Sequence, residues 1–251
     1  MDGLLGFLPE GLTLLSAFIL IFASFFTSAL TAAVGVGGGL LMLGLMTYVI
    51  PIAALIPVHG LVQLGSNTGR SYLQREHINW SIVRLFLVGS LLGALLGAMI
   101  FVRMPIDILK GLLGVFILVI VWVKLPKIEK ANPIVVALGG AGTTFISLFV
   151  GATGPLVAVF LSKLFDGHRG MVATHGMTMT VQHLLKVVAF GFVGFAFWQW
   201  LPLVLMIVVS GFMGTKFGTS LLGKISEDKL KLGFKIVITL VAVDLLRTVF
   251  V

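Results

Sequence analysis

Residues 27–40 read TSALTAAVGVGGGL and interrupt sequence that is otherwise strongly apolar. Three hydroxyl residues and four glycines fall within thirteen positions of this stretch. Glycine costs a helix roughly 1 kcal/mol relative to alanine and adopts backbone angles that other residues avoid. The stretch therefore predicts a break in a helix, at a point where the backbone can turn toward a ligand.

A second stretch of the same kind occurs in the other half of the chain. Thr143 and Thr144 precede residues 151–156, which read GATGPL. Gly151 lies 116 residues after Gly35 of the first stretch. Two such breaks predict a pair of related sites rather than one local irregularity.

The composition indicates an α-helical membrane protein. Hydrophobic residues make up 59% of the 251 residues, charged residues make up 10%, and the mean hydropathy is +1.17. Soluble domains contain roughly 25% charged residues. A formal net charge of +8 could indicate nucleic-acid binding, but here the cations lie in short loops, as they do in membrane proteins. We therefore expect no nucleic-acid partner. The absence of cysteine excludes disulfides and thiolate metal sites.

Ten apolar segments can be marked along the chain. A segment of about 20 residues is long enough to cross a bilayer as a helix. The second and seventh segments have only 13 residues and follow the two glycine stretches, so we expect interrupted or re-entrant helices there. The ten segments are 12–34, 38–50, 53–72, 81–102, 106–124, 132–151, 153–165, 171–196, 198–220 and 230–250.

The two halves of the chain also resemble each other in sequence. Matches recur in the same order, first at an offset of 116 residues and later at 121. We therefore predict two domains, a first transmembrane repeat over residues 1–125 and a second, inverted repeat over residues 132–251. The matched pairs are Gly35 with Gly151, His59 with His175, Gly60 with Gly176, Arg70 with Lys186, Gly93 with Gly214, and Gly97 with Gly218.

The distribution of Lys and Arg predicts how the chain crosses the membrane. The first 69 residues contain neither. With the N-terminus outside and every segment changing sides, thirteen of the seventeen cations face the cytoplasm, including those near residues 124–130, 163 and 224. Five segments per half is an odd number, so the second half is inverted relative to the first. Many secondary transporters are built in this way.

Polar residues follow one face of the third segment. His59, Gln63, Asn67 and Arg70 are spaced i, i+4, i+8 and i+11. Such a face inside a membrane must meet protein or water, so the first three are expected to line a cavity. Ser66 on the same face is expected to tie helices together by hydrogen bonding. Arg70 lies near the cytoplasmic end, where it either acts in gating or reaches to the interface.

The eighth segment repeats this arrangement with different residues. His175, Gln182, His183 and Lys186 are spaced i, i+7, i+8 and i+11. Lys186 lies deep in apolar sequence, where a charge is costly unless it is paired. A bound anion would supply the partner, and a structural ion pair with Asp244 is the alternative.

The spacing of the histidines and the absence of catalytic motifs argue against a metal site and against an enzyme. His175 and His183 are eight residues apart, roughly 12 Å along a helix, which is too far to share one metal ion. We expect no metal and no other cofactor. An intramembrane enzyme with a histidine base is a further hypothesis, but the sequence shows no nucleophile–base pair. We therefore expect that the protein is not an enzyme.

Helices that begin inside a membrane attract anions, because their first N–H groups are free and the helix dipole is positive there. Gly37, Gly38 and Gly39 lead into the second segment, and Thr153 and Gly154 lead into the seventh. Close packing through small residues is the alternative explanation. The occurrence of the pattern in both halves favours an anion site.

These motifs resemble those of the TauE/SafE family of sulfite exporters and organosulfonate permeases. The resemblance rests on the GVGGG run at 35–39, the Pro-rich start of the third helix, Asn79-Trp80 after a basic loop, the GATGP run at 151–155, and residues 172–186. It covers about residues 12–250. It implies a carrier in the inner membrane for sulfur-containing anions such as sulfite or sulfoacetate, without use of ATP.

The sequence as a whole predicts a secondary transporter that carries sulfite or an organosulfonate by alternating access, with proton coupling through a histidine as an option. An anion channel of the same fold and a carrier for a carboxylate or another small oxyanion are the alternatives. The expected partners are the anion, the lipid bilayer and, as an open option, a second copy of the chain in a homodimer. Arg70 is predicted as a gating or interface residue. The predicted substrate-binding residues are Gly37, Gly38, Gly39, His59, Gln63, Asn67, Thr153, Gly154, His175, Gln182, His183 and Lys186.

Overall fold

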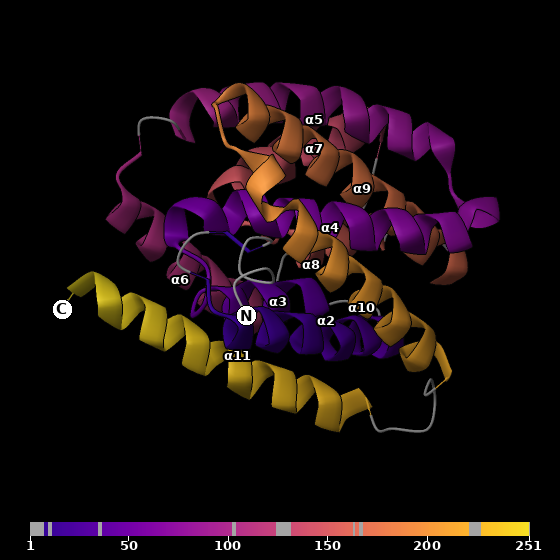
Figure 1. Ribbon diagram of the computed structural model, residues 1–251. Helices are drawn as coiled ribbons and strands as arrows, with labels where there is room; N and C mark the ends of the chain where they lie inside the picture. Colours follow the sequence, from indigo (N-terminus) through magenta and orange to yellow (C-terminus); the bar gives the residue numbers. More distant parts are fainter. Residues whose placement is uncertain are drawn as a thin grey trace.

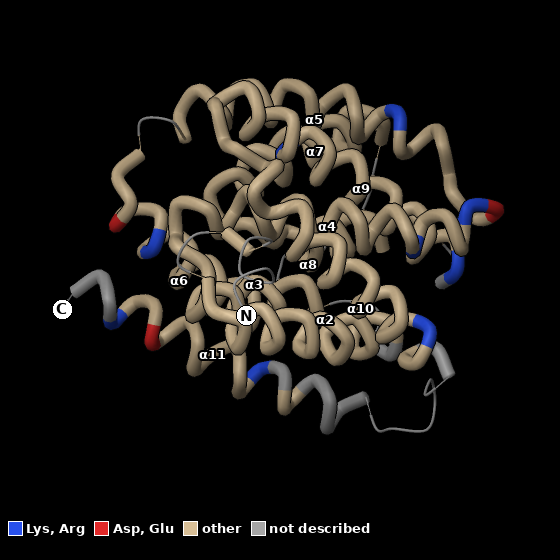
Figure 2. Tube along the Cα trace, in the orientation of Figure 1, with Lys and Arg blue, Asp and Glu red and all other residues tan. Residues whose placement is uncertain are grey.

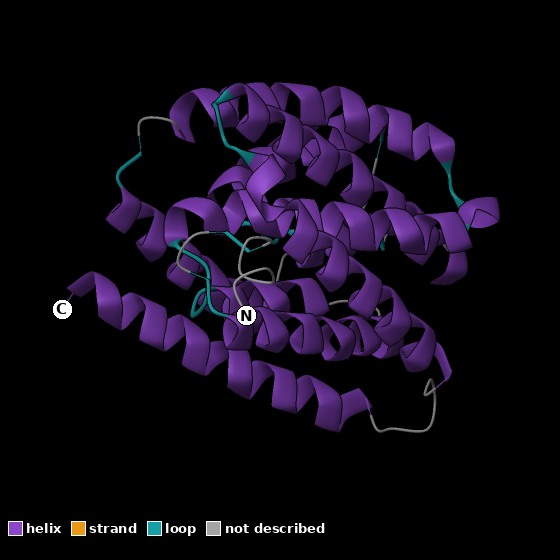
Figure 3. Cartoon of the chain, viewed as in Figure 1, coloured by secondary structure: helices purple, strands orange, loops and turns teal. Residues whose placement is uncertain are grey.

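The computed structural model describes residues 8–9, 12–34, 37–101, 104–123, 132–162, 164–165, 168–220 and 227–250. Within these ranges the chain is helical and contains no strand (Figure 1 and Figure 3). The predicted all-α fold is confirmed. The helices are α2 (Leu14–Val34), α3 (Gly38–Met46), α4 (Ile52–Leu73), α5 (Trp80–Phe101), α6 (Ile106–Trp122), α7 (Pro133–Val150), α8 (Gly154–Leu161), α9 (His168–Phe192), α10 (Leu201–Ser220) and α11 (Glu227–Phe250), with 3-10 turns η1 (Arg75–His77) and η2 (Phe197–Trp200).

Four of the described helices are long and apolar enough to span a membrane, namely α2, α5, α7 and α10. They are the first and fourth helices of each half of the chain. Large apolar side chains on them face outward, such as Phe22 of α2 and Leu92 of α5. Because lipid replaces water around such a protein, this outward apolar surface is what a membrane helix needs. The chain is therefore a multi-pass membrane protein.

Each glycine stretch turns the chain back on itself as a re-entrant hairpin. Gly37 has φ 109° and Gly151 has φ 78°, angles that side chains other than glycine rarely adopt. Gly38 at the start of α3 lies against Thr27 and Thr31 in the second half of α2, and Phe160 of α8 lies against Gly139 of α7. With nine and eight residues at about 1.5 Å each, α3 and α8 are too short to cross a bilayer. The predicted short helices after the glycine stretches are confirmed.

Glycines also bring the first and fourth helices of opposite halves into backbone contact. Gly93 of α5 lies against the carbonyl oxygen of Ala141 in α7, and Gly214 of α10 lies against that of Phe25 in α2. The glycines are 121 residues apart and the carbonyls 116, the same offsets found in the sequence. Small residues allow this close approach between membrane helices. The same pairing recurs one turn later, between Gly97 and Phe145 and between Gly218 and Ala29.

Replacing Gly93 with alanine is expected to destabilise the protein, because the added methyl group would overlap the Ala141 carbonyl oxygen. Overpacking of this kind costs about 1–3 kcal/mol. Gly111→Ala in α6 is the matched control, since nothing lies within 4 Å of the position its methyl group would take. Thermal unfolding in detergent should show a lower Tm for Gly93→Ala alone. Equal Tm values for the two variants would contradict the proposed packing.

The third helices of the two halves, α4 and α9, pack against each other in opposite directions. Gly60 of α4 lies against Lys186 of α9, whereas Gly176 of α9 lies against Ser71 of α4. The fifth helices, α6 and α11, form another pair of neighbours. Each main helix pair therefore joins one helix from each half, and the pairs correspond to each other when the two halves are interchanged. The orientation of each half in the membrane stays a prediction, and the predicted join between the two domains lies outside the described residues.

Charged residues lie mostly near the ends of the helices, and the middle of the bundle is almost free of them (Figure 2). The turn between α4 and α5 and the last turns of α10 lie at the same end, and both carry basic residues (Figure 2). This fits the predicted assignment of those segments to one side of the membrane. The lysines at 124, 127, 130, 163 and 224, on which that prediction also depends, lie outside the described residues, as does Gly35.

Candidate functional site

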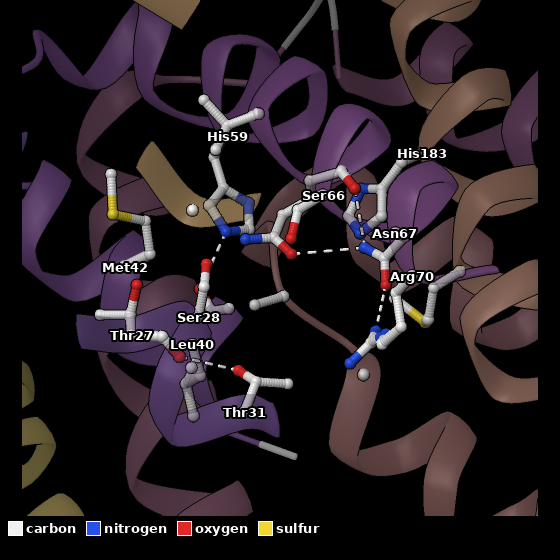
Figure 4. A pocket seen from close by; sticks show the side chains of 18 of the residues that line it. Thr27, Ser28, Thr31, Leu40, Met42, His59, Ser66, Asn67, Arg70 and His183 are labelled. Carbon is white, nitrogen blue, oxygen red and sulfur yellow. Dashed lines mark hydrogen bonds between the residues drawn. The ribbon is translucent and has the colours of Figure 1, made fainter. Parts of the chain in front are cut away.

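A polar cavity of about 60 Å³ lies inside the bundle, between α2, α3, α4, α8, α9 and α10 (Figure 4). A cavity of this size has room for a few water molecules or for one small oxyanion. It brings together parts of the chain that are far apart in sequence, and both re-entrant hairpins reach it. The predicted site residues that line it are Gly37, Gly38, Gly39, His59, Gln63, Asn67, Arg70, Gly154, His175 and His183.

The two short helices both begin at this cavity. Gly37–Leu40 of the first hairpin and Gly154 with Pro155 of the second form part of its wall. Neither N-cap residue, Gly37 or Thr153, closes the first turn with a side-chain hydrogen bond. The free N–H groups and the positive end of each helix dipole therefore remain for a ligand. Both features favour a negatively charged ligand.

Arg70 places a positive charge in the cavity wall. Its guanidinium group donates a hydrogen bond to Asn67 Oδ1, one turn earlier on α4 (Figure 4). Asn67 is itself held by its Nδ2, which donates to the carbonyl oxygen of Gln63 at 2.8 Å. No Asp or Glu occurs among the described residues that line the cavity. The charge of Arg70 is therefore not balanced by a carboxylate there, and an anion would balance it.

Three histidines complete the wall, and two of them make equivalent bonds. His59 Nε2 donates to the carbonyl oxygen of Gly39 at 2.9 Å, and His175 Nε2 donates to that of Gly154 at 3.0 Å. Each bond joins the third helix of one half to the first turn of the short helix in that half. His183 lies edge-on to His59 with ring centroids 6.1 Å apart, and the buried Nδ1 atoms of both rings have no partner among the described residues. His59 and His175 each use Nε2 in a hydrogen bond, whereas no ring hydrogen bond of His183 occurs among the described residues, so His183 is the histidine best placed to bind a ligand.

Three other predicted residues lie behind the cavity wall. Thr153, Gln182 and Lys186 are fully buried and do not line the cavity. Gln182 Nε2 donates to Thr153 Oγ1 at 2.6 Å, and Lys186 Nζ donates to the carbonyl oxygen of Gly151 at 2.6 Å. The structure thus separates these three residues from the rest of the predicted set in this conformation.

Asp244, the alternative partner considered for Lys186, is engaged elsewhere. Its Oδ1 lies 3.7 Å from Nη2 of Arg247, one turn along α11. The two residues are on the outer helix α11, and neither lines the cavity. Among the described residues Lys186 has no acidic partner, and a backbone carbonyl holds its ammonium group instead.

Sequence reasoning missed one wall of the cavity, which α2 supplies. Ser24, Thr27, Ser28 and Thr31 line it, and Figure 4 shows the last three facing the start of α3. Their spacing of i, i+3, i+4 and i+7 puts them on one helical face, and this signal was present in the sequence. Ser66, expected only to tie helices together, also lines the cavity. The wall therefore offers hydroxyl groups opposite the basic face of α4.

The fold and the cavity together define a multi-pass membrane transporter, with a central polar site between two re-entrant hairpins. The chain belongs to the sulfite exporter TauE/SafE family, whose sequence model matches residues 20–245. The match confirms the resemblance found in the sequence. Comparison with curated proteins and with solved structures gave no match.

Proposed function

We propose that the protein carries a small sulfur oxyanion, in the first place sulfite, across a bacterial-type inner membrane by alternating access. The observation that carries the proposal is the Arg70 guanidinium group in a cavity whose described lining contains no carboxylate. Two helix starts add positive dipole ends to the same cavity. The family match supports this choice of substrate class, since its description is that of a sulfite exporter.

The cavity has room for sulfite, which has four heavy atoms, because a volume of about 60 Å³ would hold roughly four to six water molecules. We place sulfite ahead of sulfoacetate and taurine because the family description names it.

Each group of the wall has a role in this proposal. Arg70 binds two oxygens of the anion at once, because a guanidinium group presents paired N–H donors. The N–H groups of the first turns of α3 and α8 bind the remaining oxygen. Asn67 positions Arg70. His183, with its unpartnered Nδ1, offers a site for a proton that travels with the anion.

The substrate class can be tested with purified protein. Sulfite is expected to raise the Tm most, ahead of sulfate, thiosulfate, taurine, sulfoacetate and small carboxylates. At 100-fold excess over Kd a ligand stabilises the folded state by about 2.7 kcal/mol, a readily measured shift. Proteoliposomes should show saturable uptake of radiolabelled sulfite. Stabilisation by carboxylates or by cations alone would contradict the proposal.

The same proteoliposomes distinguish a carrier from an anion channel. A carrier exchanges internal unlabelled sulfite for external labelled sulfite, so that label accumulates transiently against its gradient. A channel gives no such counterflow and passes a steady current instead. A pH gradient imposed across the membrane should drive sulfite accumulation if a proton accompanies the anion.

A further inference from the structure

The two basic residues of the central helices, Arg70 and Lys186, occupy matching positions in the two halves but lie at opposite ends of the contact between α4 and α9. Gly60 of α4 lies against the stem of Lys186, since a methyl group there would be 2.9 Å from Cδ. Gly176 of α9 lies near Arg70, with 3.6 Å from the same methyl position to Nε. Ten residues of α4 separate Gly60 from Arg70, about 15 Å at 1.5 Å per residue. The side chain of each basic residue therefore packs over a glycine on the facing helix, which belongs to the other half of the chain.

The two cations differ in what they contact. Arg70 lines the cavity and bonds to Asn67 on its own helix. Lys186 is 0% exposed, stays out of the cavity, and donates to the carbonyl oxygen of Gly151 at 2.6 Å. Gly151 is the residue with φ 78° that joins α7 to α8. The equivalent basic residues of the two halves therefore differ in their contacts: Arg70 faces the cavity, whereas Lys186 bonds to a backbone carbonyl away from it.

The surroundings of Lys186 are suited to a second ligand contact. His183, one turn earlier on α9, lines the cavity and has an unpartnered, buried Nδ1. Gln182, also one turn away, has a buried Oε1 without a partner among the described residues. An ammonium group has three N–H donors, and the one bond described for Lys186 uses a single donor. A flexible four-carbon stem allows the group to reach toward His183.

We infer that Lys186 is the second anion ligand of the transport cycle and replaces Arg70 in the opposite conformation. The inference rests on the proposed function, because alternating access exchanges the states of the two halves. In that conformation Lys186 leaves the Gly151 carbonyl and binds the anion beside His183. Arg70 then withdraws from the cavity, as Lys186 is withdrawn from it in the conformation described. The anion thus meets Arg70 from one face of the membrane and Lys186 from the other.

A purely structural role for Lys186 makes a different prediction. The ammonium group could serve only to cap the C-terminal end of α7, where helix carbonyls favour a cation. Loss of the cap would then lower stability and the amount of active protein. It would leave the concentration dependence of transport unchanged at both faces.

Sulfite transport measured separately in right-side-out and inside-out membrane vesicles tests the inference. Lys186→Met, which keeps an apolar stem beside Gly60, is expected to raise KM about tenfold at one face only. Arg70→Gln is expected to raise KM at the opposite face. Lys110→Gln, at the exposed Lys110–Asp107 pair, is the control and should leave both KM values unchanged.

A second variant keeps the inference testable if Lys186→Met folds poorly. Gly60→Ala retains the ammonium group but crowds its stem, so KM should rise at the Lys186 face by a smaller factor. If Lys186→Met and Gly60→Ala leave KM unchanged at both faces, or raise it at the Arg70 face, the inference is wrong. Absence of saturable sulfite transport by the unaltered protein would instead overturn the proposed function itself, and this inference with it.

Discussion

Replacing Arg70 with glutamine is expected to reduce sulfite uptake about 100-fold at the membrane face where Arg70 binds the anion, which corresponds to about 2.7 kcal/mol. Arg70 is the cation that lines the cavity, and no carboxylate occurs in the described part of that wall. Glutamine retains hydrogen bonding and much of the volume but removes the charge. The anion would then be buried without a counter-charge, which is costly in a region that excludes water. Initial rates of radiolabelled sulfite uptake, measured separately in right-side-out and inside-out vesicles, show the effect.

Two further variants separate the charge of Arg70 from its position. Arg75→Gln removes a cation five residues away that is exposed and donates to the carbonyl oxygen of Tyr72, so its uptake rate should stay within about twofold. Arg70→Lys keeps the charge but loses the paired donors, and an intermediate rate is expected. Equal rates for Arg70→Gln and Arg75→Gln would show that the anion does not bind at this cavity.

Much of the fold could be predicted from the sequence, because the features that determine it are local. Apolar runs mark the helices, and each of the ten predicted segments overlaps one of the observed α-helices. The two glycine stretches mark the re-entrant hairpins, since backbone angles such as φ 109° at Gly37 favour glycine. Gly93 and Gly214, which the sequence matches between the halves, contact the backbones of α7 and α2. Composition alone indicated a membrane protein.

The candidate site could be predicted only in part, because helical periodicity places a Cα on a face but does not fix where a long side chain ends. Lys186 shares a face with His183, yet its stem carries the ammonium group past Gly60 to the carbonyl oxygen of Gly151. Arg70 appeared to lie near an interface, yet its bond to Asn67 holds it at the cavity. The position of Lys186 depends on Gly60 and Gly151, which are distant in sequence, so no local pattern specifies it. The bond of Arg70 to Asn67 is local, but helical spacing alone does not select this rotamer over one that reaches the interface.

The hydroxyl face of α2 was missed for a related reason. Serine and threonine in membrane helices commonly bond to carbonyls of their own helix, as Thr31 does to Thr27 at 2.9 Å. Their presence therefore does not by itself indicate a cavity. Only the return of α3 alongside α2 brings these hydroxyl groups opposite α4 (Figure 4). The hairpin that the glycines produce is what converts a packing face into a binding wall.

Replacing Gly38 with alanine is accordingly expected to abolish most transport. The added methyl group would overlap both the carbonyl oxygen of Thr27 and the hydroxyl oxygen of Thr31 on α2. A backbone carbonyl inside a helix cannot move aside, so the start of α3 must shift instead. The free N–H groups of its first turn would then leave the cavity. We expect a loss of stability of about 1–3 kcal/mol and a larger, at least tenfold, loss of sulfite transport.

A graded series makes this prediction specific to the position of α3. A methyl group at Gly39 would lie 3.0 Å from Oε1 of Gln63, the end of a flexible side chain that can move away. A methyl group at Gly111 would meet nothing within 4 Å. Transport should therefore fall steeply for Gly38→Ala, moderately for Gly39→Ala and hardly for Gly111→Ala. If Gly38→Ala transports as well as Gly111→Ala, the first turn of α3 does not bind the anion. If Gly38→Ala and Gly39→Ala lose transport equally, the N–H groups at the cavity matter but the contact with α2 does not position them.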